Sequence, residues 1–588
     1  MADKSLDGQT SNLVDERYNH RWGFTDSTFV RKGDYSVSFT GTRYALSGTE
    51  MPEFLPFVEE MLDIKLDFDN VKLEIEDKPA ADPNINEGFM EALKKVYPES
   101  QYSFEKTQRI VHSHGQTTAD EVYKVIYGRL ERVVDLVTYP ESDEDVEKLV
   151  ALAQEHNVCL VPYGGGTSVS CALQLPASDP RMMVAVDMRR MDKIVWIDRE
   201  NFRAEVQAGM TGKDLEEALE KEGFTTGHEP DSLELSTVGG WIATNASGMK
   251  KNRYGNIEDI VENVTMITAR GLMDQSVDTP RNSIGMQPQQ LLFGSEGNLG
   301  IITKAVMKIH KLPEAQKFGS LVFPNFKSGT DFLYELMRTG TLPASVRLLD
   351  NIQFRFGSAL KPKPTTSDKL MSKLQKLFLL NIKGFDPNEL CAATIVMEGT
   401  AEEVAFQSKL INRIAKKHRG IPGGSTNGQR GYMLTYAIAY IRDFLAEFEI
   451  IGETYETTVP WDKVHEVMEA VDKVAHEKHA EYNLPGKPYV SPRVTQLYHT
   501  GVCIYFTHGF STHGVENPDV VFSIIEHALR ETIMAHGGSV SHHHGVGKIR
   551  KDFMADTLSE TSIELLKDIK QAYDPDNIFG IGNNIFAG

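Results

Sequence analysis

The stretch "VCLVPYGGGTSVS", Val158 to Ser170, gives the first indication of the fold, because an apolar strand runs directly into a glycine-rich loop. Consecutive glycines carry no Cβ, so their backbone N–H groups can converge on an anion. Thr167 and Ser168 add hydroxyl donors. The loop is neither a Walker loop, which needs GxxxxGK[ST], nor a GxGxxG turn that opens a long helix. Taken alone, it predicts either an anion-binding loop or an ordinary turn.

Two further loops favour the first interpretation. "HEPDSLELSTVGGWIATNASGMKKNRYGNIED", His228 to Asp259, is long and dense in Gly, Ser, Thr and Asn. Loops of such length inside a compact domain are usually functional. "LLFGSEGNLGIIT", Leu291 to Thr303, again leads small residues into an apolar strand. Three such loops in this order are more specific than any one of them.

The segments around these loops alternate between strand and helix patterns. They predict an α+β domain over about 128–312. The predicted strands are 133–140, 158–161, 182–188, 193–198 and 203–209, and the predicted helices are 141–157 and 211–223.

The rest of the chain divides into three parts. Amphipathic patterns at 49–64 and 86–98 predict a mainly helical N-terminal region over 1–127. After 312, strands alternate with long helices up to about 565, and residues 566–588 form a tail. The Lys- and Pro-rich segment 361–377 is predicted to be a surface excursion.

Composition excludes several classes of protein. The net charge is 62 − 83 = −21 over 588 residues, which argues against a nucleic-acid partner. Four cysteines without a CxxC pair exclude a disulfide framework and a zinc ribbon, and favour a reducing compartment. The sequence has no apolar run of about 18 residues, the length that a membrane-spanning helix would need. We recognise neither a secretory signal nor a Ser-Lys-Leu peroxisomal address.

The three loops resemble the FAD-binding domain of the vanillyl-alcohol oxidase flavoprotein family. The resemblance implies an α+β fold with a two-subdomain FAD-binding domain at 128–312, an α/β cap domain at 313–565, a helical N-terminal region at 1–127, and a tail at 566–588 that packs on the FAD domain. In that family the first loop wraps the pyrophosphate, and the other two line the ribityl chain, the isoalloxazine and the adenine. Many members attach flavin through a histidine of the first loop, where this chain has Tyr163, so we expect non-covalent FAD.

The FAD-binding residues that the resemblance implies lie in these three loops. They are Pro162, Tyr163, Gly164, Gly165, Gly166, Thr167 and Ser168; Pro230, Asp231, Ser232, Leu233, Glu234, Leu235, Ser236, Ala243, Thr244, Asn245 and Ala246; and Ser295, Glu296, Gly297, Asn298, Leu299, Gly300 and Ile301.

Further segments are similar to the ether-lipid-forming members of the family. They are "RWGFTDSTF" at 21–29, "ASVRLLDNIQFRFG" at 344–357, "YIRDF" at 440–444, "RVTQLYHTGVCIYF" at 493–506 and "SHHHGVGKIRKDF" at 541–553. This similarity implies an enzyme that exchanges the acyl chain of 1-acyl-dihydroxyacetone phosphate for a long-chain fatty alcohol. It further implies a peroxisomal homodimer, with the peroxisomal membrane surface as a partner.

Because this exchange has no net redox change, we hypothesise that flavin acts covalently. A base would remove a C1 proton, the carbanion would add to flavin N5, the carboxylate would leave, and the alcohol would add. The resemblance implies Tyr505 as the base, and Arg347 and Arg442 as groups that hold the phosphate or the enolate oxygen. From the residues alone, Tyr505 is better explained as a core residue. Arg347 is then better explained as a helix cap or a partner of Asp350, and Arg442 as a surface residue beside Asp443.

Three consecutive histidines, His542, His543 and His544, open the last of these segments. On an extended strand, the first and third would face one way and the second the other. One metal ion could then take two of them at most, so we predict no metal site. We interpret the triplet as an acid–base cluster that lowers the pKa of Tyr505 and moves protons, with His543 dispensable if the strand picture holds. Lys548 and Arg550 either contact phosphate or form a solvated basic face.

Three other functions compete with this interpretation. A flavin-dependent 2-hydroxyacid dehydrogenase would share the fold, although the C-terminal "DPDNIFGIGNN" at 574–584 lacks the tail of lactate-type relatives. A metal-dependent hydrolase could be built on the histidine triplet. A catalytically silent protein could bind FAD without turnover.

Overall fold

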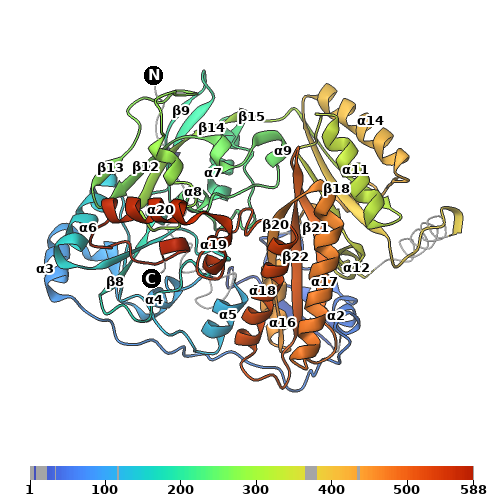
Figure 1. Cartoon of the computed structure of the whole chain (residues 1–588), viewed down its shortest axis with the longest axis horizontal. Helices are drawn as coiled ribbons and strands as arrows, with labels where there is room; N and C mark the ends of the chain where they lie inside the picture. Colours follow the sequence, from blue (N-terminus) through green and yellow to red (C-terminus); the bar gives the residue numbers. More distant parts are fainter. Residues whose placement is uncertain are drawn as a thin grey trace.

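The computed structural model describes residues 6–7, 23–33, 35–115, 118–363, 381–433 and 438–586. Figure 1 shows two main bodies side by side, one carrying strands β8, β12 and β14 and the other the long helices α17 and α18. Most of the segment 361–377, predicted as a surface excursion, lies outside the described residues.

The first body has two parts, and the first part is a four-stranded sheet in the order β5-β6-β8-β7. β6, β8 and β7 run parallel. They are almost wholly buried, as parallel strands covered on both faces are, and helices α3 and α6 pack into the same core. The bounds are β5 Tyr102–Ser103, β6 Leu136–Thr138, β7 Cys159–Tyr163, β8 Met183–Asp187, α3 Glu87–Val96 and α6 Asp143–His156.

The second part is a six-stranded sheet in the order β1-β9-β10-β14-β12-β13, and its strand pairs are antiparallel. Helices α7 and α8 pack on it. The strands and helices that the sequence predicts over 133–223 are therefore confirmed. The bounds are β1 Leu6–Asp7, β9 Lys193–Asp198, β10 Arg203–Gln207, β12 Val261–Thr268, β13 Gly271–Met273, β14 Ile301–Lys308, α7 Gly212–Lys221, α8 Val238–Thr244, α9 Lys251–Tyr254 and α10 Ile257–Ile260, with the separate pair β11 Phe224–Thr225 and β15 His310–Lys311.

The second body, the cap, is a seven-stranded antiparallel sheet in the order β19-β16-β18-β17-β21-β22-β20. Its bounds are β16 Ala315–Phe323, β17 Ser345–Leu349, β18 Cys391–Gly399, β19 Ile421–Pro422, β20 Ile450–Pro460, β21 Tyr489–Leu497, β22 Gly501–Ser511, α11 Phe326–Arg338, α12 Asn351–Ala359, α14 Ala401–Lys417, α15 Ser425–Met433, α16 Ile438–Ala446, α17 Val464–Glu481 and α18 Pro518–Ala535.

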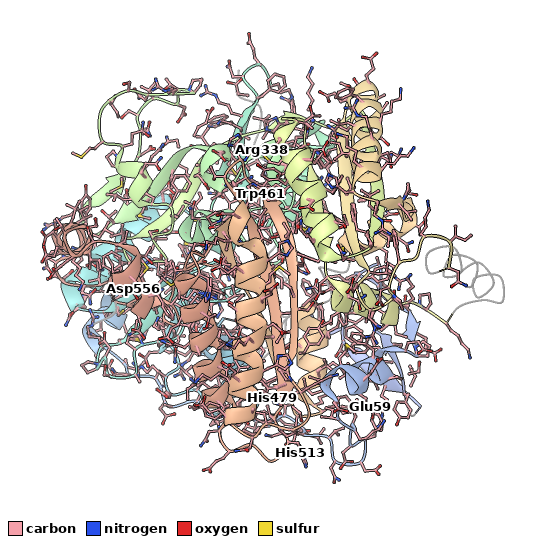
Figure 2. All side chains as sticks on the ribbon, turned by 45° about the vertical axis from the view of Figure 1, so that its right-hand side comes forward. Glu59, Arg338, Trp461, His479, His513 and Asp556 are labelled. Atoms are coloured by element: carbon pink, nitrogen blue, oxygen red, sulfur yellow. The ribbon has the colours of Figure 1, made fainter. Side chains whose placement is uncertain are left out.

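The two faces of the cap sheet differ in chemistry. One face carries Val494, Ile504 and Phe506, which share a core with α17 and α18. Figure 2 shows α17 lying along the strands, from Trp461 just before its start to His479 near its end. Because successive side chains of a strand alternate, Arg493 and Tyr505 face the opposite way, toward the FAD-binding body.

In its described part the N-terminal region contains the predicted helices, but this part is not mainly helical. The predicted helix at 49–64 is α2 Phe54–Leu62 and that at 86–98 is α3, and two further helices are α4 Lys106–Val111 and α5 Ala119–Ile126. A three-stranded sheet precedes them, made of β2 Phe29–Lys32, β3 Ser36–Phe39 and β4 Glu50–Met51. Its β3 alternates buried and half-buried residues, which is the period of a strand. Phe29 and Phe54 pack with Phe444 of the cap.

The C-terminal segment packs on the FAD-binding body. Helix α20, Glu560–Tyr573, crosses the predicted boundary at 565/566. Beyond it, Ile578 and Phe579 enter the core of the parallel sheet, and the Leu160 N–H donates to the Ile578 carbonyl at 2.7 Å. Within the described ranges, the helices lack a stretch both long and apolar enough to cross a bilayer.

Candidate active site

A cavity of about 220 Å³ lies where the three predicted loops meet the cap. The glycine loop leaves the buried strand β7, and the loop after His228 leads into α8. The predicted residues that line this cavity are Pro162, Tyr163, Gly164, Gly165, Gly166, Thr167, Ser168, Pro230, Asp231, Ser232, Ser236, Ala243, Thr244, Ala246, Ser295, Glu296, Gly297, Gly300 and Ile301. The cap contributes Tyr505, His543 and His544.

Six predicted FAD-binding residues do not line the cavity: Leu233, Glu234, Leu235, Asn245, Asn298 and Leu299. Their contacts support the loops instead. Glu234 accepts a hydrogen bond from Tyr44 at 2.9 Å, and Leu235 is buried in the core below the N-terminal sheet. Asn298 bridges two segments, because its amide donates to the Ser295 carbonyl and its oxygen accepts from Asn583.

Several lining residues were missed from the sequence, among them Thr237, Gly239, Trp241, Ile581 and Asn583. The first three lie inside "STVGGW", and the small residues of this stretch could have indicated that they line the cavity. The last two lie more than 400 positions after the glycine loop and reach the cavity only through the packing of the C-terminal segment.

The glycine loop fits a backbone cradle for a phosphate-containing cofactor. A Cβ on Gly165 would lie 1.9 Å from the Leu235 carbonyl oxygen, and one on Gly164 would lie 2.4 Å from Thr237 Oγ1. The first two loops therefore touch at a distance that only glycine permits. Ser295 Oγ is buried at the cavity wall without a hydrogen-bond partner. Because buried polar groups are normally satisfied, this hydroxyl fits a polar ligand such as FAD.

The Ser295→Ala variant should bind FAD about 3- to 10-fold more weakly, the loss of one hydrogen bond. Titration of the FAD-free protein measures this. The Thr303→Val variant is the matched control, because Thr303 Oγ1 is also buried and unpartnered but does not line the cavity. Equal affinity in wild type and Ser295→Ala, or an equal loss in both variants, would contradict the assignment.

Strand register brings three chemically active residues together on the cap. Tyr505 on β22 lies directly opposite Glu456 on β20 and opposite Arg493 on β21. Tyr505 Oη lies 3.0 Å from His544 Nε2 and 3.3 Å from Thr454 Oγ1. The sequence placed Tyr505 at the site, but it missed Glu456 and Arg493.

Glu456 fixes the conformation of the histidine segment. Its carboxylate accepts the backbone N–H groups of His542, His543 (3.2 Å) and His544 (2.9 Å) and the Ser541 hydroxyl at 2.8 Å. The segment is thus an irregular loop wrapped around a buried carboxylate, and the strand prediction is wrong. His543 lines the cavity, so the expectation that it faces away and could be dispensable loses its basis.

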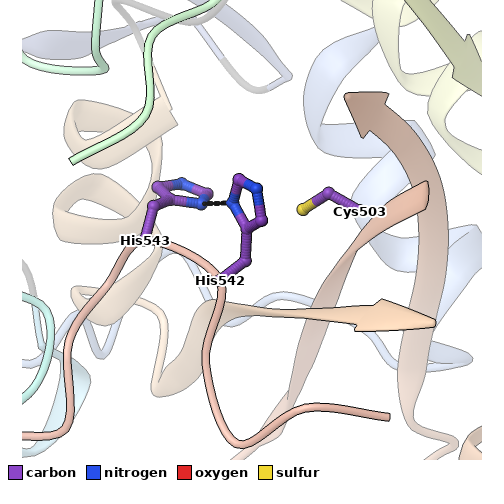
Figure 3. A group of neighbouring side chains, drawn as sticks. All are labelled: Cys503, His542 and His543. Atoms are coloured by element: carbon purple, nitrogen blue, oxygen red, sulfur yellow. Dashed lines mark hydrogen bonds between the residues drawn. The ribbon is translucent and has the colours of Figure 1, made fainter. Parts of the chain in front are cut away.

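Two of the three rings form a second array. His542 Nδ1 lies 2.7 Å from His543 Nδ1, and His542 Nε2 lies 2.5 Å from Tyr498 Oη. Cys503 points toward His542 (Figure 3), and the three side chains could in principle surround a metal ion. However, both ring nitrogens of His542 are engaged, and burial raises the pKa of the Cys503 thiol. The arrangement favours a hydrogen-bonded cluster over a metal centre.

Burial keeps the histidines neutral. It lowers the pKa of His542 to about 3, and it lowers the pKa of His543 and holds that of His544 well below the ordinary range. Burial also raises the pKa of Tyr505. The charge of Asp231 raises this pKa further, and the charge of Arg493 lowers it. The expectation that the histidines lower the pKa of Tyr505 is therefore wrong, because neutral rings supply no positive charge.

The predicted arginines are not brought together. Arg347 lies on β17 in the polar face of the cap, with its guanidinium 5.3 Å from the centroid of the Tyr432 ring. Asp350, its alternative partner, accepts from Ser491 at 2.7 Å instead. Arg442 pairs with Asp443 at 2.6 Å and lines a second, small cavity rather than that of Tyr505.

Lys548 and Arg550 hold loops together. The Lys548 ammonium donates to Asn583 Oδ1 at 2.7 Å, and the Arg550 guanidinium donates to the Gly545 carbonyl at 3.0 Å and to the Val169 carbonyl. Arg550 is fully buried. Neither residue forms a solvated basic face, and together they fasten the histidine segment to the glycine loop and the C-terminus.

Comparison with known proteins agrees with this geometry. Residues 134–274 match the model "FAD binding domain", and residues 312–583 match "FAD linked oxidases, C-terminal domain". Fold and cavity thus define a flavoprotein of the FAD-linked oxidase type, as the resemblance of the three loops implied.

Relatives define the branch within this class. The chain is 43% identical to alkyldihydroxyacetonephosphate synthase of Caenorhabditis elegans, over 96% of this chain and 94% of the relative, and 31% identical to that of Dictyostelium discoideum, over 95% and 91%. A solved alkyldihydroxyacetonephosphate synthase superposes with a TM-score of 0.84 at 28% identity, covering 96% of this chain and 98% of the other. The chain belongs to the alkyldihydroxyacetonephosphate synthase family.

Proposed function

We propose that this chain makes ether lipid by exchanging the acyl group of 1-acyl-dihydroxyacetone phosphate for a long-chain alcohol, with FAD bound non-covalently. The products are 1-alkyl-dihydroxyacetone phosphate and a fatty acid. The observation that carries the proposal is the array Tyr505–His544–Glu456 at the cap side of the FAD cavity.

FAD, when bound, supplies an electrophilic ring at which the C1 carbon can react without net redox change. The chain's own residues must then move protons. One C1 hydrogen, acidified by the neighbouring ketone, leaves before the C1–O bond to the carboxylate breaks. The alcohol oxygen later forms the new C1–O bond and loses its proton, and C1 regains a proton, so atoms and electrons balance.

We assign the removal of the C1 proton to Tyr505. His544 is the group that accepts the proton of the phenol. A phenol with a raised pKa is a poor base alone, but neutral His544 Nε2 lies 3.0 Å away and can take the phenol proton as the phenol oxygen takes that of C1. His544 Nδ1 lies 3.5 Å from the Glu456 carboxylate, which stabilises the imidazolium that forms. The three groups thus act as a tyrosine-based counterpart of a catalytic triad.

His542 and His543 offer a separate route for the alcohol and carboxylate protons. His543 lines the cavity and contacts His542, which contacts Tyr498 in turn. The Lys251 ammonium lies 3.5 Å from the centroid of the Tyr498 ring. A proton accepted by His543 can therefore be passed away from the flavin face.

The pH dependence of kcat follows from the lowered pKa of His544. An ordinary histidine becomes protonated, and unable to accept a proton, below about pH 6.5. Because burial holds the pKa of His544 well below that value, the neutral form persists in mild acid. We expect kcat at saturating substrate to change little between pH 7.5 and 6. An acid limb with its midpoint near 6.5 would contradict neutral, buried His544.

Labelled hexadecanol tests the exchange itself. The FAD-loaded protein, incubated with 1-acyl-dihydroxyacetone phosphate and labelled hexadecanol, should form labelled ether and free fatty acid in equal amounts. Added 2-hydroxyacids should leave the flavin oxidised under anaerobic conditions. No labelled ether, or bleaching by a 2-hydroxyacid, would contradict the proposal and favour a dehydrogenase on the same fold.

We also propose that the protein works as a homodimer at the peroxisomal membrane surface. The support is family resemblance alone.

A further inference from the structure

Arg493 is a buried cation that forms no ion pair with a carboxylate of the described residues. Its side chain is 8% exposed, and its guanidinium carbon lies 4.3 Å from the centroid of the Tyr505 ring. Nε is buried without a hydrogen-bond partner, and no carboxylate of the described ranges pairs with the guanidinium. Buried charges are normally paired or bound to a ligand, so this cation indicates an anionic ligand.

The carboxylates near Arg493 are engaged elsewhere. Glu456 is surrounded by the backbone N–H groups of the histidine segment. Asp350 accepts from the Gln353 N–H and the Ser491 hydroxyl, and burial raises its pKa to about 7. Asp231 lines the cavity and acts on Tyr505 and His543 by its charge. Among the described residues no carboxylate forms an ion pair with Arg493, so the structure favours a ligand as the source of an anion beside it.

The position of Arg493 suits one part of the proposed substrate. Its β21 strand lies next to the β22 strand of Tyr505, one strand further from the edge strand β20. In 1-acyl-dihydroxyacetone phosphate only the ketone carbon separates C1 from the carbon that bears the phosphate. With C1 at Tyr505, the phosphate must lie close by, and a planar guanidinium can hold it through two parallel hydrogen bonds.

We propose that Arg493 binds the phosphate of the substrate and so positions C1 against Tyr505. This inference rests on the proposed function, and it assigns a ligand class, a phosphomonoester, to a residue that sequence reasoning missed. Arg347 lies on the same polar face, two positions from Leu349, which pairs with Arg493. It adds positive charge to this face.

Binding to the FAD-loaded protein tests the proposal without turnover. Calorimetry should detect binding of dihydroxyacetone phosphate. Inorganic phosphate should compete with it and bind more weakly. Arg493→Met should weaken binding of dihydroxyacetone phosphate by about 30- to 100-fold, the loss of charge-assisted hydrogen bonds, and Arg493→Lys should weaken it less. Binding of dihydroxyacetone, which lacks phosphate, should not change.

Arg109→Met is the matched control. Arg109 is also buried, but it donates to the Val134 and Ala81 carbonyls rather than to a ligand. The Arg109→Met substitution should lower the melting temperature and leave binding of dihydroxyacetone phosphate unchanged. Unchanged phosphate affinity in a folded, FAD-loaded Arg493→Met would overturn the proposal. Phosphate-dependent binding without ether formation would instead contradict the proposed function and leave the anion site standing.

Discussion

Tyr505→Phe should lower the rate of acyl-for-alkyl exchange by about 10²- to 10⁴-fold, the range for removal of a general base. The substitution deletes only the hydroxyl, which lies 3.0 Å from His544 Nε2 and lines the cavity. FAD content and melting temperature should stay close to those of the wild type, because the ring keeps its packing. The rate of labelled ether formation at saturating substrate is the measurement.

Tyr455→Phe is the control for this substitution. Tyr455 precedes Glu456 on β20, faces the opposite side of the sheet, and has a buried hydroxyl without a partner. Its removal should change the exchange rate less than about twofold and cost little stability. A Tyr505→Phe enzyme with wild-type activity would exclude the phenol as the base.

Glu456→Gln should lose at least about 100-fold in exchange rate and about 2–4 kcal/mol of stability. The amide keeps one acceptor oxygen, but its NH₂ group would face N–H groups that the carboxylate now accepts. The histidine segment would then loosen, and His544 would lose the charge that stabilises its protonated form. Urea unfolding and ether formation measure the two effects.

Glu453→Gln provides the contrast. Glu453 lies on the same strand, accepts the Ala119 N–H at 2.9 Å, and has a pKa raised by burial to about 8. It is therefore largely a neutral acid at pH 7, and an amide can replace it at small cost. Equal losses of exchange rate and stability in Glu456→Gln and Glu453→Gln would show that burial of a carboxyl group, rather than the contacts of Glu456, causes the losses.

Acid should destabilise the wild type through Glu456. Burial opposes its charge, but the three backbone N–H groups that it accepts and the nearby Arg530 guanidinium outweigh burial and hold its pKa well below the usual range. A carboxyl with a depressed folded-state pKa stabilises the fold above its unfolded pKa of about 4.3, and this stability is lost as pH falls toward the folded value.

The sequence predicted the FAD-binding part well, because that chemistry is written in contiguous loops. Glycine runs such as Gly164–Gly166 mark close backbone approach, and strand periodicity placed β8, β9 and β10. The N-terminal sheet was missed because its strands span only two to four residues each.

The proposed catalytic array was less accessible to sequence reasoning, since cross-strand register assembles most of it. The pairing of β20, β21 and β22 brings Glu456, Arg493 and Tyr505 together, and the hydrogen bond from the His544 N–H to Glu456 adds His544. A buried glutamate in "GETYETTVP" shows no period that marks it as an anchor. The burial that keeps the histidines neutral is likewise a property of the packed fold.

The most direct test of the account is exchange carried out in D₂O. If the Tyr505–His544–Glu456 array removes and returns a C1 proton, the ether product should carry deuterium at C1, measured by mass spectrometry and NMR. Tyr505→Phe should suppress incorporation together with ether formation. Wild-type ether that retains both original C1 hydrogens would contradict the account.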